Sequence, residues 1–249
     1  MEYRKMGNTF PPVTANLLII NGLLWLATIV FTKIGVVDLE HYLGLHFWRG
    51  DGFNAAQMIT YMFMHDQSSF THLFFNMFSL FMFGRLLEQV LGGKRFLFYY
   101  LTSGLGAALV QQLTWELTWQ NEFVTSMANA NHVSFDVIKN ALASGELDEF
   151  VNEFCSSFVT VGASGAVFGI LLAFGMLFPN LEMYIIPIPF PLKAKWVVIG
   201  YGALELFFGV AGLMSGVAHF AHLGGMLFGF MILMYWRYAG RRNGNGNVG

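Results

Sequence analysis

Charged residues and cysteine are both scarce in this chain of 249 residues. Lys, Arg, Asp and Glu make up 11% of the sequence, whereas soluble domains carry about 25%. The single cysteine, Cys155, excludes an internal disulfide. A formal net charge of -2 gives no basic excess, so no nucleic-acid partner is expected. Hydrophobic residues account for 55% and aromatic residues for 17%, and this composition predicts a membrane protein.

Long apolar runs predict six membrane-spanning helices. They cover residues 15–31, 71–91, 96–113, 163–178, 196–213 and 214–236. A hydrocarbon core about 30 Å thick needs about 20 helical residues, and the fourth run is roughly 24 Å long, so it starts below the outer surface. The Ser215-Gly216 pair marks the junction between the last two runs. We therefore predict an all-α, polytopic protein of the lipid bilayer, built as a bundle of six transmembrane helices.

The predicted organisation is one core, residues 15–236, between two short ends. Residues 1–14 form an N-terminal segment, and residues 237–249, rich in Gly and Asn, form a flexible tail. Two long segments on the outer side interrupt the core. The first is a loop over residues 38–69, in which short helices are expected at the membrane surface. The second is an acidic insertion over about residues 114–158, whose second half is expected to form one or two amphipathic helices.

Cationic residues predict the orientation, because Lys and Arg close to span ends are retained in the cytoplasm. With six alternating spans, one side receives Arg4, Lys5, Lys94, Arg95, Lys193, Lys195, Arg237, Arg241 and Arg242. Lys33, Arg49 and Lys139 fall on the opposite side. We therefore expect both termini in the cytoplasm, and we expect the protein to reside in a bacterial inner membrane.

Several polar residues fall at one depth within the predicted spans. Ser164 lies in the fourth span, His222 in the sixth, and Asn76 in the second with His72 one turn above it. Rises of about 21 Å from the inner span ends place these groups in the same outer layer. Placing each of these polar groups within the membrane costs on the order of a few kcal/mol unless it faces the bundle interior or water. They are expected to converge on one site, whereas Glu205, deep in the fifth span, is expected to hydrogen-bond a neighbouring helix.

A serine and a histidine at this depth predict nucleophilic catalysis. A serine hydroxyl becomes an effective nucleophile when a base takes its proton, and imidazole is the usual base. No acid lies near the outer ends of spans four and six, so a dyad of Ser164 and His222 is the economical arrangement. The side chains of His72 and Asn76, with the backbone N–H of Ser164 at a helix start, can stabilise an oxyanion.

Three segments together resemble the rhomboid intramembrane serine proteases. They are His72-Leu-Phe-Phe-Asn76, Gly162-Ala-Ser164-Gly165, and Ala221-His222-Leu-Gly-Gly225 followed by Gly229. The resemblance covers the six-span core, and the segments agree with the family in type, order and spacing. Gly225 and Gly229, four residues apart on one helix, are typical of close helix packing, which would bring the sixth span against the fourth.

The resemblance implies a role for each of these residues. Ser164 would be the nucleophile, His222 the base, and His72, Asn76 and the Ser164 amide the oxyanion site. Phe168 falls where the family places an aromatic ring on the catalytic histidine. The implied function is hydrolysis of peptide bonds in or near transmembrane segments of other membrane proteins, which reach the site laterally. The implied chemistry uses no cofactor and no metal.

One part of the outer loop departs from the family pattern. Members often carry a Trp-Arg pair shortly before the segment that matches Phe63-Met-His65. Here that position holds Ala56-Gln57, and Trp48-Arg49 lies earlier in the chain. We therefore expect this loop to be held in a different way from the corresponding loop of the rhomboid proteases.

Two other functions stay open at this point. A non-proteolytic, rhomboid-like protein that binds transmembrane clients would use the same fold, but it would be expected to lack the serine or the histidine. A transporter of metal ions or protons would draw on His219, His222 and Glu205, with His65 and His72 nearby. Spans four and six lack the mid-membrane acids that such a transporter needs. His219, nearly one turn closer to water than His222, is expected to be a supporting residue.

Overall fold

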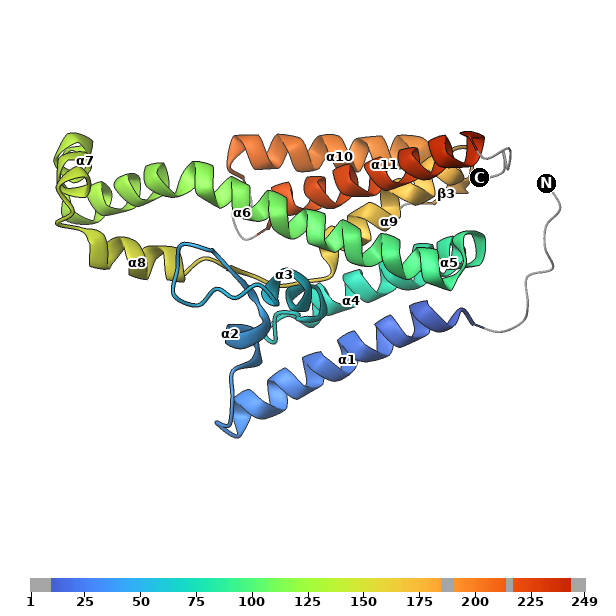
Figure 1. The fold of residues 1–249 in the computed structure, drawn as a ribbon, viewed down its shortest axis with the longest axis horizontal. Coiled ribbons are helices and arrows are strands. Elements are labelled where there is room, and N and C mark those ends of the chain that lie inside the picture. The colour runs from blue at the N-terminus through green and yellow to red at the C-terminus, as the bar shows by residue number, and fades with distance from the viewer. Residues whose placement is uncertain (1–9, 185–189, 214–216, 243–249) are drawn as a thin grey trace.

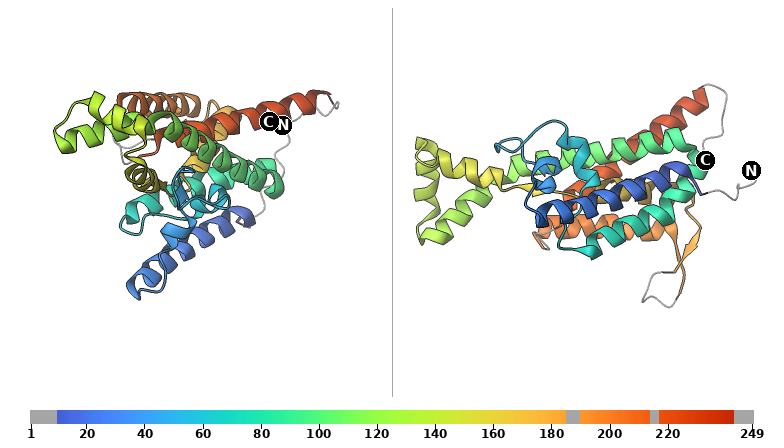
Figure 2. Two further views of the ribbon diagram at one scale, coloured as in Figure 1. Left: turned by 60° about the vertical axis from the view of Figure 1, so that its left-hand side comes forward. Right: turned by 90° about the horizontal axis from the view of Figure 1, so that it is seen from below.

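The computed structural model describes residues 10–184, 190–213 and 217–242, and these residues are mostly helical. Within them, six helical stretches run back and forth, so that consecutive stretches point in opposite directions (Figure 1). The stretches are α1 (Pro12–Lys33), α4 with α5 (Phe70–Leu91), α6 (Gly93–Asn131), α9 (Ser164–Leu177), α10 (Ala194–Ala211) and α11 (His219–Arg242). The start of α1 and the end of α11 lie at the same end of the bundle (Figure 2).

Four of the described helices are long and apolar enough to cross a membrane. They are Pro12–Lys33, Phe70–Leu91, Ala194–Ala211 and His219–Arg242. Their outer faces expose large apolar side chains, among them Ile19, Leu23, Leu26, Phe75, Leu204, Phe207 and Val210. Soluble proteins rarely expose apolar surface of this extent, because water would not solvate it favourably. The expected polytopic membrane bundle is therefore confirmed in this general form.

The short helix α9 lies in the interior of the bundle. It packs against α6, α10 and α11, and most of its residues are buried, including Ile170 and Phe174. The long stretch formed by α4 (Phe70–Ser79) and α5 (Arg85–Leu91) is continuous through a π-helical turn over Leu80–Gly84. Since α9 is enclosed by longer helices, its first residue is held below the end of the bundle.

The third helix differs from the prediction. It was expected to stop at Leu113, but α6 continues to Asn131. Its polar extension stays helical because one face remains apolar and packs against α7 (Phe135–Ser144) and α8 (Asp148–Ser156). The buried residues of this second, separate core are Phe47, Trp119, Phe123, Val124, Ala128, Ile138 and Cys155. The expected amphipathic helices thus exist, and Figure 1 shows them projecting from one end of the bundle.

Another helix boundary also differs from the sequence prediction. The helix α11 begins at His219 rather than at residue 214. Its predicted junction, Ser215-Gly216, lies outside the described residues, as do the terminal segments 1–9 and 243–249. The all-α prediction omits two antiparallel pairs of two-residue strands. These pairs are β1 (Leu45–His46) with β2 (Val159–Thr160), and β3 (Glu182–Met183) with β4 (Leu192–Lys193).

The outer loop over residues 38–69 contains the expected short helices, α2 (Leu39–Leu43) and α3 (Gln57–Thr60), followed by a 3-10 turn at Tyr61–Phe63. The buried side chain of Gln57 organises this loop. Its oxygen accepts hydrogen bonds from the backbone N–H groups of His46 and Asn54. Its amide donates to the backbone carbonyls of Tyr42 and Gly52. A glutamine therefore holds the loop at the position where the resemblance to rhomboid proteases led us to look for a Trp-Arg pair.

The Trp48-Arg49 pair ties the same loop to the extended part of α6. The indole N–H of Trp48 and the guanidinium of Arg49 both donate to the carboxylate of Glu116. The hydrogen bonds to Glu116 raise the pKa of Arg49, which stays charged in any case. The continuation of α6 beyond the predicted span end thus provides the partner for this pair.

Candidate active site

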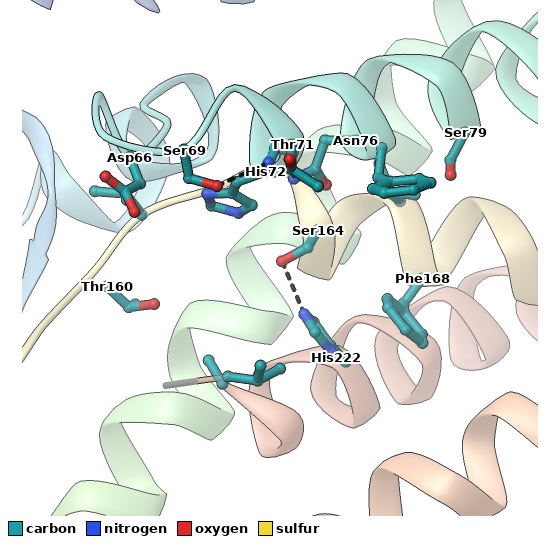
Figure 3. A pocket seen from close by; sticks show the side chains of 15 residues that line it. Asp66, Ser69, Thr71, His72, Asn76, Ser79, Thr160, Ser164, Phe168 and His222 are labelled. Carbon is teal, nitrogen blue, oxygen red and sulfur yellow. Dashed lines mark hydrogen bonds between the residues drawn. The ribbon is translucent and has the colours of Figure 1, made fainter. Parts of the chain in front are cut away.

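Residues from three helices surround one cavity of about 520 Å³. His72 and Asn76 come from α4, Ser164 and Phe168 from α9, and His222 from α11 (Figure 3). All five were singled out from the sequence, and the structure brings them together. The cavity lies among apolar helices, where a polar side chain is costly unless it has a partner.

Ser164 and His222 are hydrogen-bonded to each other. Oγ of Ser164 lies 2.8 Å from Nε2 of His222, although the two residues are 58 positions apart in the chain. Ser164 is the first residue of α9, and His222 lies one turn inside α11. The ring of Phe168 stacks on that of His222, with centroids 4.2 Å apart and planes inclined by 7°. The imidazole is thus fixed in a plane from which it can take the serine proton.

Close packing of α9 against α11 makes this contact possible. A Cβ atom on Gly225 would lie 1.9 Å from the backbone oxygen of Gly165 on α9, and one on Gly229 would lie 2.3 Å from the hydroxyl of Tyr99 on α6. No side chain fits at such distances. Gly162 has a φ of +131°, and a Cβ atom there would lie 2.9 Å from Nε2 of His72. Glycine is therefore required both where the helices meet and in the turn before Ser164.

The potential oxyanion donors lie on one side of Ser164. The Asn76 amide donates one hydrogen bond to the backbone oxygen of His72 at 2.9 Å, which leaves its second N–H available to a ligand. The backbone N–H of Ser164 belongs to the first turn of α9, where amides have no partner within the helix. His72 lines the cavity beside them. Together these groups can supply three donors to a negatively charged oxygen.

His65 contacts this group from the loop side. Its ring centroid lies 5.2 Å from that of His72. Burial first, and the neighbouring His72 second, lower the pKa of His65 to about 3. His65 is therefore neutral around pH 7 and shapes the wall next to His72 without adding charge there.

Glu205, which was not expected to take part in catalysis, also contacts His222. Oε2 of Glu205, on α10, lies 3.0 Å from Nδ1 of His222 and 2.7 Å from Nδ1 of His219. The expected hydrogen bond to a neighbouring helix is thus confirmed, but it falls on the ring that contacts Ser164. A signal was present in the sequence. Glu205 lies about two turns from the outer end of its helix, and His219 and His222, three residues apart, share one helix face.

The same three side chains could be considered as metal ligands, because their ligand atoms lie within 4.8 Å of one another. Ligand atoms around a tetrahedral Zn²⁺ at about 2.1 Å are about 3.4 Å apart. The separations of 2.7 and 3.0 Å between carboxylate and imidazole atoms are shorter and match hydrogen bonds. The geometry therefore fits a hydrogen-bonded cluster better than a metal centre.

Comparisons with known proteins identify the family of the chain. RHOMBOID-like protein 6, mitochondrial, of Arabidopsis thaliana is 27% identical over 207 residues, which cover 80% of this chain and 47% of that protein. Rhomboid protease AarA of Providencia stuartii is 29% identical over 174 residues, which cover 69% of this chain and 52% of that protein. The chain thus spans about half the length of these curated relatives. Residues 46–239 match the Rhomboid domain, and because this match covers well over half of the sequence, the chain belongs to the rhomboid family.

Proposed function

We propose that this protein is an intramembrane serine protease that hydrolyses peptide bonds in or near transmembrane segments of other membrane proteins. The observation that carries the proposal is the 2.8 Å hydrogen bond between Ser164 Oγ and His222 Nε2 at a cavity inside an apolar bundle. One of the relatives is named a rhomboid protease, and the family to which the chain belongs has many proteolytic members.

The arrangement suits acyl transfer in two steps. Nε2 of His222 takes the proton of Ser164 as Oγ attacks the scissile carbonyl, and the resulting oxyanion meets the donors at His72, Asn76 and the Ser164 amide. The imidazolium then protonates the leaving amine, and the C–N bond breaks. Water, deprotonated by the same ring, hydrolyses the acyl-enzyme and regenerates the serine.

The topology belongs to the same proposal. We assign six spans by adding α6 and the short α9 to the four long apolar helices, with both termini in the cytoplasm of a bacterial cell. The cavity would then face the outer side, and α7 and α8 would project beyond the outer surface. Water reaches Ser164 from that side, and a substrate segment reaches it through the lipid.

Binding of transmembrane clients without cleavage is the weaker candidate. Client binding requires the bundle and its lipid-exposed faces, but it does not explain why a serine and an imidazole are held in hydrogen-bond contact. We therefore favour proteolysis.

The test uses the full-length protein reconstituted with a single-span substrate. Ser164→Ala and His222→Ala are expected to abolish cleavage while the melting temperature stays close to that of the unsubstituted protein. A fluorophosphonate probe is expected to label Ser164, as mapped by mass spectrometry. Ser79→Ala is a matched control, since Ser79 lines the same cavity away from the Ser164–His222 hydrogen bond. Cleavage by the Ser164→Ala protein would contradict the proposal.

A further inference from the structure

Glu205 is a carboxylate placed where a charge is expensive. It lies within the apolar helix α10, between the exposed side chains of Leu204 and Leu206. Its own side chain is only 13% exposed, because it points toward α11. An acid at such a position must have partners that repay its removal from water. Both partners are histidines of α11, His219 and His222.

The contact with His222 determines which ring nitrogen carries the proton. A carboxylate oxygen accepts hydrogen bonds, so Nδ1 of His222 is the donor toward Glu205. In the neutral ring Nε2 is then unprotonated, with its lone pair directed at the hydroxyl of Ser164. This is the tautomer that a general base needs. When Nε2 gains the serine proton, the imidazolium forms next to the carboxylate, which stabilises it.

The contact with His219 holds the carboxylate in place. Nδ1 of His219 lies 2.7 Å from the same oxygen of Glu205, and Nε2 lies 3.2 Å from the backbone oxygen of Leu213. A carboxylate oxygen accepts hydrogen bonds, so Nδ1 of His219 is the donor toward Glu205. This hydrogen bond lowers the cost of burying the carboxylate. His219 therefore holds the carboxylate of Glu205 in place, and Glu205 in turn orients the ring of His222.

We infer that Glu205 is a positioning residue for His222, so that the site is a Ser164–His222–Glu205 triad with His219 as its outer support. The inference rests on the proposed function of Ser164 and His222. It goes beyond the dyad that the sequence favoured, because the third group comes from a different helix, α10.

Two variants separate the charge of Glu205 from its shape. Glu205→Gln keeps the size and one acceptor oxygen but removes the charge, and Glu205→Leu removes both. Cleavage of the single-span substrate is expected to lose about 10²-fold or more in kcat for the Gln variant, with KM within about twofold. The Glu205→Leu variant should show a larger decrease in kcat than Glu205→Gln. Gly200→Ala is the control on the same helix, since nothing lies within 4 Å of a Cβ atom there.

A measurement that does not depend on turnover tests the tautomer directly. In protein carrying ¹⁵N-labelled histidine, NMR should show Nδ1 of His222 protonated in the unsubstituted protein and in Glu205→Gln. In Glu205→Leu the signal should shift toward the Nε2-protonated form. If Glu205 only links α10 to α11 structurally, His219→Asn and Glu205→Gln should lower the melting temperature and the apparent kcat in parallel. The folded fraction of each variant should then show a normal kcat.

The outcomes separate this inference from the proposed function. If Ser164→Ala and His222→Ala abolish cleavage but Glu205→Gln and Glu205→Leu retain normal kcat, the triad is wrong and the dyad stands. If Ser164→Ala still cleaves the substrate, both are wrong. Stoichiometric zinc in the purified protein that disappears in Glu205→Gln would also overturn the inference, because the three groups would then be metal ligands.

Discussion

Gly225 sets the distance between the two helices that carry the candidate nucleophile and base. The atom that a side chain would strike is the backbone oxygen of Gly165, which is fixed within α9 and cannot rotate away. Gly165 itself directly follows Ser164. Any increase in this separation is therefore transmitted to the Ser164–His222 hydrogen bond within one residue.

Gly225→Ala is accordingly expected to separate α9 from α11. Overpacking of this kind typically destabilises a protein by about 1–3 kcal/mol. Because the added methyl group would strike a backbone atom, we expect a loss of stability at the upper end of this range. The expected result is a lower melting temperature and loss of fluorophosphonate labelling at Ser164. Gly22→Ala on α1 is the control, since nothing lies within 4 Å of that position. Normal labelling of the Gly225→Ala protein would show that the helices can part without disturbing the site.

Gln57 is the residue on which the outer loop depends most. Replacement by Met keeps the volume but leaves two backbone N–H groups and two carbonyls without their partner. Each buried unsatisfied group costs about 1–3 kcal/mol, although water can relieve part of this. We expect Gln57→Met to destabilise the protein by at least about 2 kcal/mol and to raise hydrogen exchange over residues 42–57. The exposed Gln120→Met is the control, and equal exchange in the two variants would refute the assignment.

At the scale of elements, α1 is fastened to the bundle through its N-terminus. No side chain caps this helix locally, but the Glu88 carboxylate of α5 accepts from the backbone N–H groups of Val13 and Thr14 and from the Thr14 hydroxyl. A carboxylate at a helix start also interacts favourably with the helix dipole. Because much of α1 faces outward, this contact is a principal link between α1 and the rest of the protein.

Removing the charge at this link should loosen α1 selectively. Glu88→Gln retains one acceptor oxygen but directs an N–H group toward other donors. We therefore expect the free energy of unfolding to fall by about 1–3 kcal/mol. Hydrogen exchange should rise in the first turns of α1 before it rises in α9 or α11. Gln89→Ala, at the exposed neighbouring position, should leave exchange unchanged. A uniform rise across all helices would show that Glu88 supports the whole fold rather than one element.

The sequence located helices better than it located contacts between them. Apolar runs are long and continuous, so they gave α1, α4 with α5, α9 and α10 to within a few residues. Residue counting gave the depth of Ser164 and His222 along their helices, but depth does not specify which way a side chain points around the axis. For this reason the sequence did not predict the contact of Glu205 with His222. Likewise, nothing in the sequence indicates that the carboxylate of Glu88 contacts α1.

The extent of α6 was missed for a related reason. A rise in polarity marks the end of an apolar run, and therefore the end of a membrane crossing, but a helix continues wherever one face has something to pack against. Here Phe123 and its neighbours find that surface on α7 and α8. These contacts between distant segments cannot be read from local polarity.

At the scale of the whole molecule, the described residues form two apolar cores. One lies within the bundle, and the other lies among the end of α6, α7 and α8. The buried residues of the two cores differ, and Trp115, half-buried on α6, packs against both. We therefore expect damage to the smaller core to leave the cavity at Ser164 in place. The projecting unit would then be an addition to the helical bundle rather than a support for the cavity.

Phe123→Ala tests this independence. Truncation of a buried Phe costs about 3–5 kcal/mol, which is expected to raise hydrogen exchange over residues 120–156. Fluorophosphonate labelling of Ser164 should stay within about twofold of the unsubstituted rate. Phe135→Ala, exposed on α7, is the matched control. Loss of labelling in Phe123→Ala would show that the projecting unit supports the active site.

The buried residues of α10 are Ala194, Val197 and Val198, which all belong to its first turns. Toward its other end, the carboxylate of Glu205 provides a polar attachment to α11. If an arriving transmembrane segment displaces that end of α10, it also takes the carboxylate away from His222. If the protein is a protease as proposed, the site would then be open but inactive, and it would become active again when α10 returns to its packed position. Under the same proposal, displacement of α10 in the absence of substrate would not leave Ser164 active toward neighbouring proteins.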